Sequence, residues 1–264
     1  MLFRKELKHN IKSFLIWFAV LLFFSSMIAP FVDGIMQDAD SLKEFINSLP
    51  KFMLKIFNIS EKFITPEGFF SAKVMFAAEI FAGVFAVILA SNIFVSEFET
   101  KTIEYLLTKP LNRKKIFFKK FLALFIYYTI FAALFCLSVL SLFKIYVHYE
   151  YNPYILAGFS LYLFVIEIFF GSLTILFSVI FQKNFITIST TMGIFLLMFT
   201  ADMLGSAVSS IEWIRNLTIF KFISLGDTVK YDKVYILNSF IIILLGLMII
   251  FISEKIFEKK DIMI

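Results

Sequence analysis

Six long apolar runs constrain what this chain can fold into more than any other feature of its sequence. A helix needs about 20 predominantly apolar residues to cross the hydrocarbon core of a bilayer, and each run has roughly that length. Hydrophobic residues make up 60% of the 264 and charged residues only 17%, so little of the chain is left for a soluble domain. The sequence therefore predicts an all-α membrane protein that forms one six-span domain over residues 1–264. The runs cover residues 14–32, 74–95, 121–147, 155–181, 185–204 and 234–253.

The basic residues outside these runs predict the orientation of the chain. Six spans place both termini on the same side of the membrane. Most of the Lys and Arg residues fall on that side, at the two termini, between Lys101 and Lys120, and at Lys183. Because cytoplasmic loops carry an excess of Lys and Arg, we expect a multi-pass protein of the cell membrane with both termini in the cytoplasm. Phe3, Leu7 and Ile11 share a helical face among basic residues, which predicts an N-terminal interfacial helix.

Residues 97–120 are the long polar interruption with a strong charge bias, acidic at the start and basic at the end. Within them Ile103, Leu106 and Leu107 fall on one face of a short amphipathic helix. Pro110 is expected to end that helix, and Asn112 is a good N-cap for the next one. The basic residues that follow Asn112 would lie at a helix N-terminus, where each is unfavourable by about 0.3 to 1 kcal/mol. We therefore expect these basic residues to interact with a partner outside their own helix.

Residues 102–120, TIEYLLTKPLNRKKIFFKK, resemble the cytoplasmic segment between the second and third spans of ABC-2 type transporter permeases. The family pattern has a leading acid, a Gly-Thr pair, a hydrophobic-Glu-x-Leu-Leu helix, a proline, an arginine and a lysine that opens the next span. This chain departs from the pattern at Lys101, which occupies the usual glycine position. The matching residues are Thr102, Glu104, Leu106, Leu107, Pro110, Arg113 and Lys120, with Glu97 or Glu99 as the leading acid.

The resemblance implies that this segment carries a coupling helix that docks on a separate cytoplasmic ABC ATPase. It also implies a permease subunit that works with two copies of that ATPase and a second permease copy, either identical or a close paralogue, and that exports its substrate. The alternative is a basic loop that only sets the topology. The candidate coupling residues are Glu97, Glu99, Thr102, Ile103, Glu104, Leu106, Leu107, Pro110 and Arg113.

The second and fifth runs are the least lipid-like, and in the family these spans commonly border the translocation route or the dimer seam. Alanines recur every four residues in the second run, at 78, 82, 86 and 90, and form a smooth ridge that lets helices approach closely. Glu79 lies beside this ridge, either as a hydrogen-bonded carboxyl near the headgroups or as a pathway residue. The first half of the fifth run is polar and includes Thr190 and Thr191, which are further pathway candidates.

Glu167 lies about twelve residues into the fourth run, which is roughly 18 Å along a helix and therefore near the bilayer centre. An ionised carboxylate there costs about 2.5 to 3.5 kcal/mol on insertion, so it must face protein or water, find a donor, or stay protonated. The hydroxyls of Ser172, Thr174 and the group around Thr190 are candidate donors. Two roles stay open, a hydrogen bond that fixes helix packing and a residue that lines or gates the substrate route.

The sequence excludes several other kinds of function. It contains no Gly-Lys pair and hence no GxxxxGK[ST] phosphate loop, so we expect the partner ATPase, and not this chain, to bind ATP and Mg. His9 and His148 lie outside the runs and no HExxH motif exists, so neither a metal cofactor nor proteolysis is expected.

Nothing in the sequence indicates a nucleic-acid partner, and the spans are expected to be surrounded by membrane lipid. An ATPase-independent six-helix carrier is the alternative, although such carriers usually show internal repeats, which we do not see. The Phe-rich interior suits a lipid-like molecule, an antibiotic or an amphipathic peptide.

Overall fold

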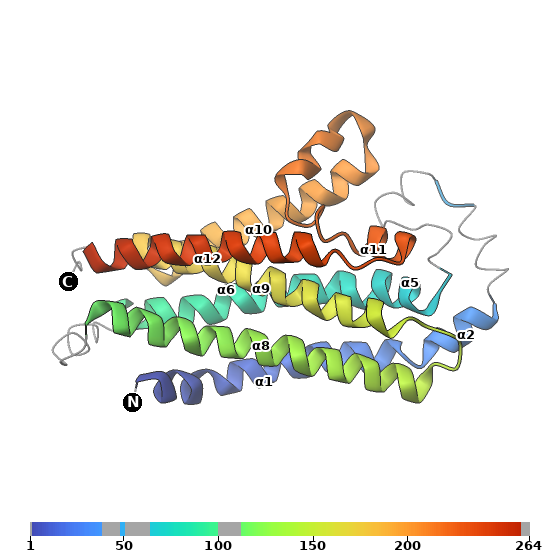
Figure 1. Cartoon of the computed structure of the whole chain (residues 1–264), viewed down its shortest axis with the longest axis horizontal. Helices are drawn as coiled ribbons and strands as arrows, with labels where there is room; N and C mark the ends of the chain where they lie inside the picture. Colours follow the sequence, from blue (N-terminus) through green and yellow to red (C-terminus); the bar gives the residue numbers. More distant parts are fainter. Residues whose placement is uncertain (1, 39–47, 51–63, 100–111, 260–264) are drawn as a thin grey trace.

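The computed structural model describes residues 2–38, 48–50, 64–99 and 112–259, and these residues form a bundle of long helices without a strand (Figure 1). Six helical stretches in this part of the chain are long and apolar enough to cross a membrane. The prediction of an all-α, six-span membrane protein is confirmed. The long helices are α1 (Leu2–Ile28), α6 (Phe76–Glu99), α8 (Arg113–Tyr146), α9 (Pro153–Phe181), α10 (Asn184–Ala207) and α12 (Ile236–Lys259).

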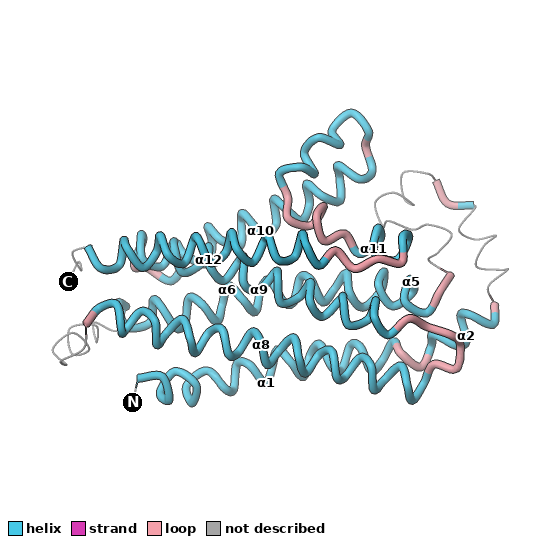
Figure 2. Tube along the Cα trace, in the orientation of Figure 1, coloured by secondary structure: helices cyan, strands magenta, loops and turns pink. Residues whose placement is uncertain are grey.

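Shorter elements extend or connect the long helices; Figure 2 shows all helices in cyan and the loops between them in pink. The π-helical turn η2 joins α5 to α6 without a break. The second span therefore covers Pro66–Glu99. Pro66 follows the N-cap Thr65, whose side chain accepts a hydrogen bond from the Gly68 amide. The shorter elements are α2 (Phe31–Gln37), α5 (Pro66–Phe70), η2 (Ser71–Met75), η3 (Ser209–Leu217) and α11 (Leu225–Tyr231).

The two ends of the bundle differ in what they contain. The start of α1, the end of α6, the start of α8 and the end of α12 lie at one end, on the left in Figure 1, which we call the terminal end. The opposite end, which we call the far end, carries α2, α5 and α11. At the terminal end only Gln182 and Lys183 connect α9 to α10, and Gln182 has a left-handed backbone (φ 54°) that ends α9.

The centre of the bundle is α9, which contacts α6, α8, α10 and α12. Its closest partner is α6, whose alanine ridge, predicted from the sequence, is fully buried at Ala78, Ala82, Ala86 and Ala90. α6 also meets α10 closely: a Cβ added at Gly83 would lie 2.3 Å from the ring of Phe195. Small residues therefore allow these helices to approach one another, while long apolar side chains on α10 and α12 stay exposed on the outside of the bundle.

The N-terminal segment is the first part of α1 and not a separate interfacial helix. Glu6, Asn10 and Phe14 are buried on one face of α1, and the Tyr127 hydroxyl of α8 donates a hydrogen bond to the Leu7 carbonyl. The Phe14 ring packs 5.3 Å from that of Tyr127, centroid to centroid. Because this face finds partners on α8, the amphipathic segment continues straight into the first span.

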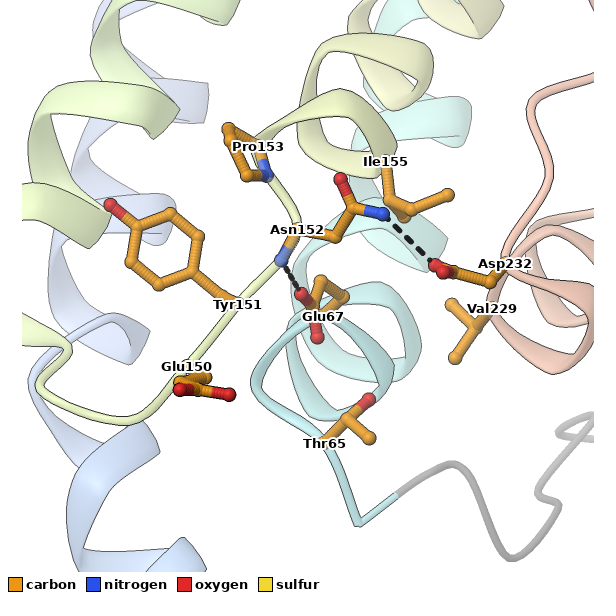
Figure 3. Close-up of a pocket in the computed structure, with 9 residues that line it drawn as sticks. All are labelled: Thr65, Glu67, Glu150, Tyr151, Asn152, Pro153, Ile155, Val229 and Asp232. Carbon is orange, nitrogen blue, oxygen red and sulfur yellow. Dashed lines mark hydrogen bonds between the residues drawn. The ribbon is translucent and has the colours of Figure 1, made fainter.

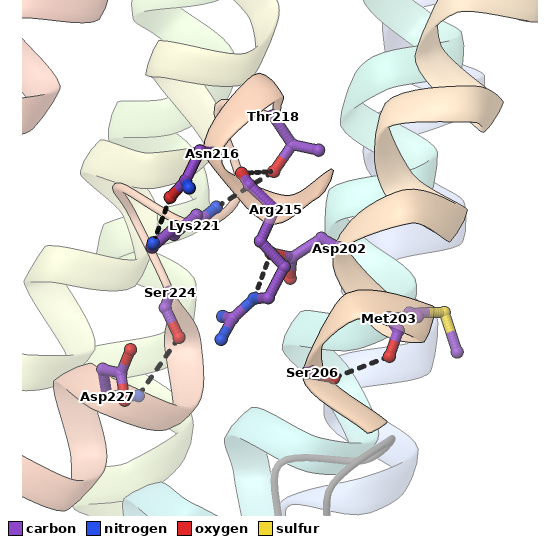
Figure 4. A network of polar contacts seen from close by, with 9 residues as sticks. All are labelled: Asp202, Met203, Ser206, Arg215, Asn216, Thr218, Lys221, Ser224 and Asp227. Carbon is purple, nitrogen blue, oxygen red and sulfur yellow. Dashed lines mark hydrogen bonds and ion pairs between the residues drawn. The ribbon is translucent and has the colours of Figure 1, made fainter. Parts of the chain in front are cut away.

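The segment with Trp213 forms η3, which folds back beside α10 (Figure 1). Arg215 holds this hairpin together, because its Nε lies 3.0 Å from the Asp202 carboxylate of α10 and its stem packs over Gly205 (Figure 4). Trp213 is 62% exposed and Leu217 is exposed as well, so η3 presents apolar side chains outward. The arrangement is typical of a segment that lies at a membrane interface, where Trp is enriched.

Candidate functional site

The candidate coupling residues divide between the described part of the chain and residues 100–111. Thr102, Ile103, Glu104, Leu106, Leu107 and Pro110 lie outside the described residues. Glu97 and Glu99 lie in the last turn of α6, and Arg113 begins α8. The structure therefore shows the two helix ends that hold the coupling segment, which we define as residues 100–111.

Glu97 lies in a buried ionic cluster that joins three helices. Its Oε2 is 2.6 Å from Lys120 Nζ of α8, and its Oε1 is 3.3 Å from Lys5 Nζ of α1. The side chains of Lys120 and Glu97 are only 4% and 5% exposed. Glu97 is a candidate coupling residue, and the structure engages its carboxylate inside the chain, with Lys120 and Lys5. The sequence pattern held no signal for this pairing.

Glu99 ties the end of α6 to the start of α10. Its Oε1 accepts a hydrogen bond of 2.8 Å from the Asn184 amide, in the first turn of α10. The Ser91 hydroxyl donates to the Asn184 side chain from the same face of α6. A carboxylate at a helix N-terminus is favourable because it compensates the positive end of the helix dipole. Glu99 is itself exposed, so it also borders the surface beside the coupling segment.

The start of α8 is anchored on the end of α12. Asn112 is the N-cap, as predicted, and its side chain accepts from the Lys114 amide. Lys114 Nζ lies 3.0 Å from the Glu254 carboxylate, and Arg113 donates a long hydrogen bond of 3.5 Å to the Glu258 carbonyl. The basic residues that are unfavourable for α8 are therefore offset by the negative C-terminal end of α12 and by an acid within it.

Glu167 is completely buried at the centre of α9. Neither carboxylate oxygen has a hydrogen-bond partner among the described residues. The nearby Tyr128 hydroxyl packs on Gly171, one turn further along α9, but donates its own hydrogen bond to the Ala86 carbonyl at 2.7 Å. Glu167 is therefore enclosed by the contacts of α9 with its neighbours.

The hydroxyls expected to serve Glu167 bond to their own helices instead. Ser172 donates to the Phe169 carbonyl and Thr174 to the Phe170 carbonyl, each at 2.7 Å. In α10, Thr191 donates to the Thr187 carbonyl at 2.9 Å. The expectation that one of these residues donates to Glu167 is wrong, because a Ser or Thr hydroxyl in a helix readily bonds to a carbonyl three or four residues earlier.

The other pathway candidates lie on α6 and α10, both of which contact α9. The contact between Gly83 of α6 and Phe195 of α10 gives the register of these two helices. Glu79 lies one turn from this contact toward the far end, where it is buried and Asp202 is its charged neighbour. Thr191 is buried and lies one turn toward the terminal end, and Thr190 precedes it and is half-buried. The structure thus spreads the predicted polar residues along the bundle.

A cavity at the far end was not predicted from the sequence. It has a volume of about 460 Å³ and lies between α5, the loop before α9 and the end of α11 (Figure 3). Glu67 accepts a hydrogen bond from the Asn152 amide, and the Asn152 side chain donates to Asp232 at 3.1 Å. With Glu150 the cavity has three acidic residues from three separate stretches, and no spacing in the sequence could have connected them. Among the described residues, no three His, Cys, Asp or Glu side chains are placed to hold a metal ion.

Comparison with known protein families gives a match over most of the chain. The sequence profile of one family, described as ABC-2 family transporter protein, matches residues 1–231. The match includes the first five spans, the coupling segment, η3 and α11. No curated protein matches the sequence.

Proposed function

The chain belongs to the ABC-2 transporter family as a multi-pass membrane permease, and from this premise we propose that it exports a hydrophobic or amphipathic molecule with energy from a separate ATPase. The observation that carries the proposal is the family match over residues 1–231. Members of the family work in general with an ABC ATPase, which binds ATP and Mg and performs the hydrolysis. We assign no catalytic residue to this chain.

The ATPase docks, in this proposal, on the coupling segment at the cytoplasmic side. Support comes from the helix ends on either side of it, which are tied to α1, α10 and α12 through Glu97, Glu99 and Lys114. A force applied to residues 100–111 would therefore be passed to several spans through these helix ends. Thr102, Ile103, Glu104, Leu106, Leu107 and Pro110 keep their proposed contact roles, with Glu99 and Arg113 at the borders.

The permease works, in this proposal, as a dimer with two ATPase copies. α10 and α12 bury little of their surface within one copy and expose apolar side chains along their length, among them Leu197 and Leu237. A second permease copy, identical or a close paralogue, and membrane lipid would share the covering of these faces. Glu79, Glu167, Thr190 and Thr191 stay proposed pathway residues.

A double substitution in the coupling segment tests the function. We expect Leu106→Ala with Leu107→Ala to leave the permease inserted but to weaken ATPase binding, because truncating buried interface anchors costs at least about 2 kcal/mol. The measurement is co-purification of an ABC ATPase subunit with the tagged permease, together with ATP hydrolysis by the complex.

The matched control is Lys115→Gln, at an exposed position at the start of α8. It removes one attraction to the anionic leaflet, worth about 1 kcal/mol, and should leave the complex intact. Normal ATPase binding and normal hydrolysis in the double variant would contradict the coupling role. Transport that continues without ATP would favour an ATPase-independent carrier.

A further inference from the structure

We propose that Glu97 and Lys120 form a buried clamp that positions the coupling segment and passes its displacement to α1. The proposal rests on the proposed function, since it assigns to these two residues the transmission between the ATPase docking segment and the spans. Neither residue touches the ATPase in this arrangement, because both side chains are buried inside the bundle.

Lys120 contacts one turn of α6, and Glu6 of α1 is a second acidic neighbour. Its Nζ is 2.6 Å from Glu97 Oε2, donates to the Ile93 carbonyl and lies 5.8 Å from the centre of the Phe94 ring. The Ile93 carbonyl is one helical turn before Glu97, so the ammonium holds the last part of α6 from two sides. Three favourable contacts fix the position of this buried cation.

The clamp brackets the coupling segment in the sequence. Glu97 lies three residues before residue 100, and Lys120 lies nine residues after residue 111. The two helix ends that enter and leave the segment are therefore held together at its base. The other oxygen of Glu97 reaches Lys5 of α1, so one carboxylate connects the first, second and third spans.

Stability alone does not explain this ion pair. Removing two charges from water is costly, and replacing a buried pair with apolar residues of similar size is often neutral or stabilising. Two further titratable groups face the cluster from α1: Glu6, which is buried, and His9. A costly group of charges at the base of the docking segment fits a positioning role better than a packing role.

The test separates positioning from packing by neutralising both partners. Glu97→Gln with Lys120→Met keeps the shape of the pair and removes both of its charges, whereas each single change leaves one. Glu6→Gln is present in the parent and in every variant, because Lys120 also faces the buried Glu6. We expect the double variant to recover the melting temperature that the single variants lose. We also expect the double variant to stimulate ATP hydrolysis by the partner ATPase about tenfold less than the parent does. A change of this size is typical of lost coupling between sites.

A second measurement uses the permease without any ATPase. Spin labels at Thr108 and Lys183, in a Cys136→Ala background, report the position of the coupling segment relative to the start of α10. In the double variant the distance distribution should broaden, and in the control Lys115→Met it should match the parent.

Each outcome decides a different question. An unchanged distribution in the double variant, or full recovery of coupling together with stability, would overturn the clamp. If no ATPase subunit co-purifies with the parent chain, the proposed function fails, while the label distances still test the clamp.

Discussion

Glu167 has a carboxyl group that the fold encloses without a hydrogen-bond donor from the described residues. Burial of a polar group without a partner costs free energy, about 1 to 3 kcal/mol for a neutral group. A protein that keeps such a residue at the centre of its main packing helix retains a local instability. In a permease this instability suits a state in which α9 and its neighbours separate and water or substrate reaches the carboxyl.

A substitution of Glu167 tests this interpretation. We expect Glu167→Leu to raise the thermal unfolding temperature of the purified permease, because an apolar side chain replaces the unpaired carboxyl, and to lower transport. Glu167→Gln is the matched control, since its amide stays buried without partners and should bring no stabilisation. Thermal unfolding by intrinsic fluorescence and transport into vesicles measure the two effects. A loss of stability in Glu167→Leu would show that the carboxyl has a partner.

At the scale of single elements, an ion pair fastens η3 beside α10. Arg215 contacts Asp202 and packs over Gly205, and its carbonyl accepts a hydrogen bond of 3.0 Å from the Thr218 hydroxyl (Figure 4). None of the side chains of η3 is fully buried, and the Thr218 hydroxyl just after η3 also bonds to Asp202. We expect Arg215→Ala to release η3 from α10.

Hydrogen exchange over residues 209–217 measures this release, and we expect faster exchange in Arg215→Ala. Glu212→Ala is the control, because Glu212 is exposed on the same element. Removing one partner of a partly buried, hydrogen-bonded pair costs about 1 to 3 kcal/mol, which is a 5- to 150-fold change in the opening equilibrium. Equal exchange in both variants would mean that contacts other than the Arg215 pair hold η3.

The sequence predicted the spans from apolar runs, and for α8 the start came from a different signal. The apolar run covers residues 121–147, whereas the predicted N-cap Asn112 places the beginning of the helix at Arg113, as the structure has it. Apolar length shows which residues need a membrane or a core, whereas the N-cap Asn112 and the contacts with α12 decide where the helix begins. For the same reason the buried face of the N-terminal segment could not be recognised before its partner Tyr127 was placed.

The candidate site was predictable as a segment but not as a set of contacts. Its motif identified residues 97–120 and the family, while the pairing of Glu97 with Lys120 and Lys5 depends on how three helices rotate against each other. The failed prediction of donors for Glu167 has a related cause. A hydroxyl in a helix can always bond to its own backbone, and sequence spacing does not reveal which choice it makes.

For the whole molecule, the predicted orientation can be tested with positions that the structure shows to be exposed. In a Cys136→Ala background we expect single cysteines at Lys183 and Lys259 to react only from the cytoplasmic side. Cysteines at Tyr149 and Lys233, at the far end, should react only from outside. The reason is the excess of basic residues at the terminal end. An impermeant maleimide applied to intact cells and to inverted vesicles makes the measurement, and labelling of Lys183 from outside would reverse the topology.

The connection between α9 and α10 determines how these two spans can part. Only Gln182 and Lys183 join them at the terminal end, and the left-handed Gln182 turns the chain directly from one helix into the next. At the far end α10 continues into η3 and is free of any short link to α9. Two helices joined closely at one end can separate only at the other end. A passage between α9 and α10 would therefore widen toward the far end while its terminal end stays shut.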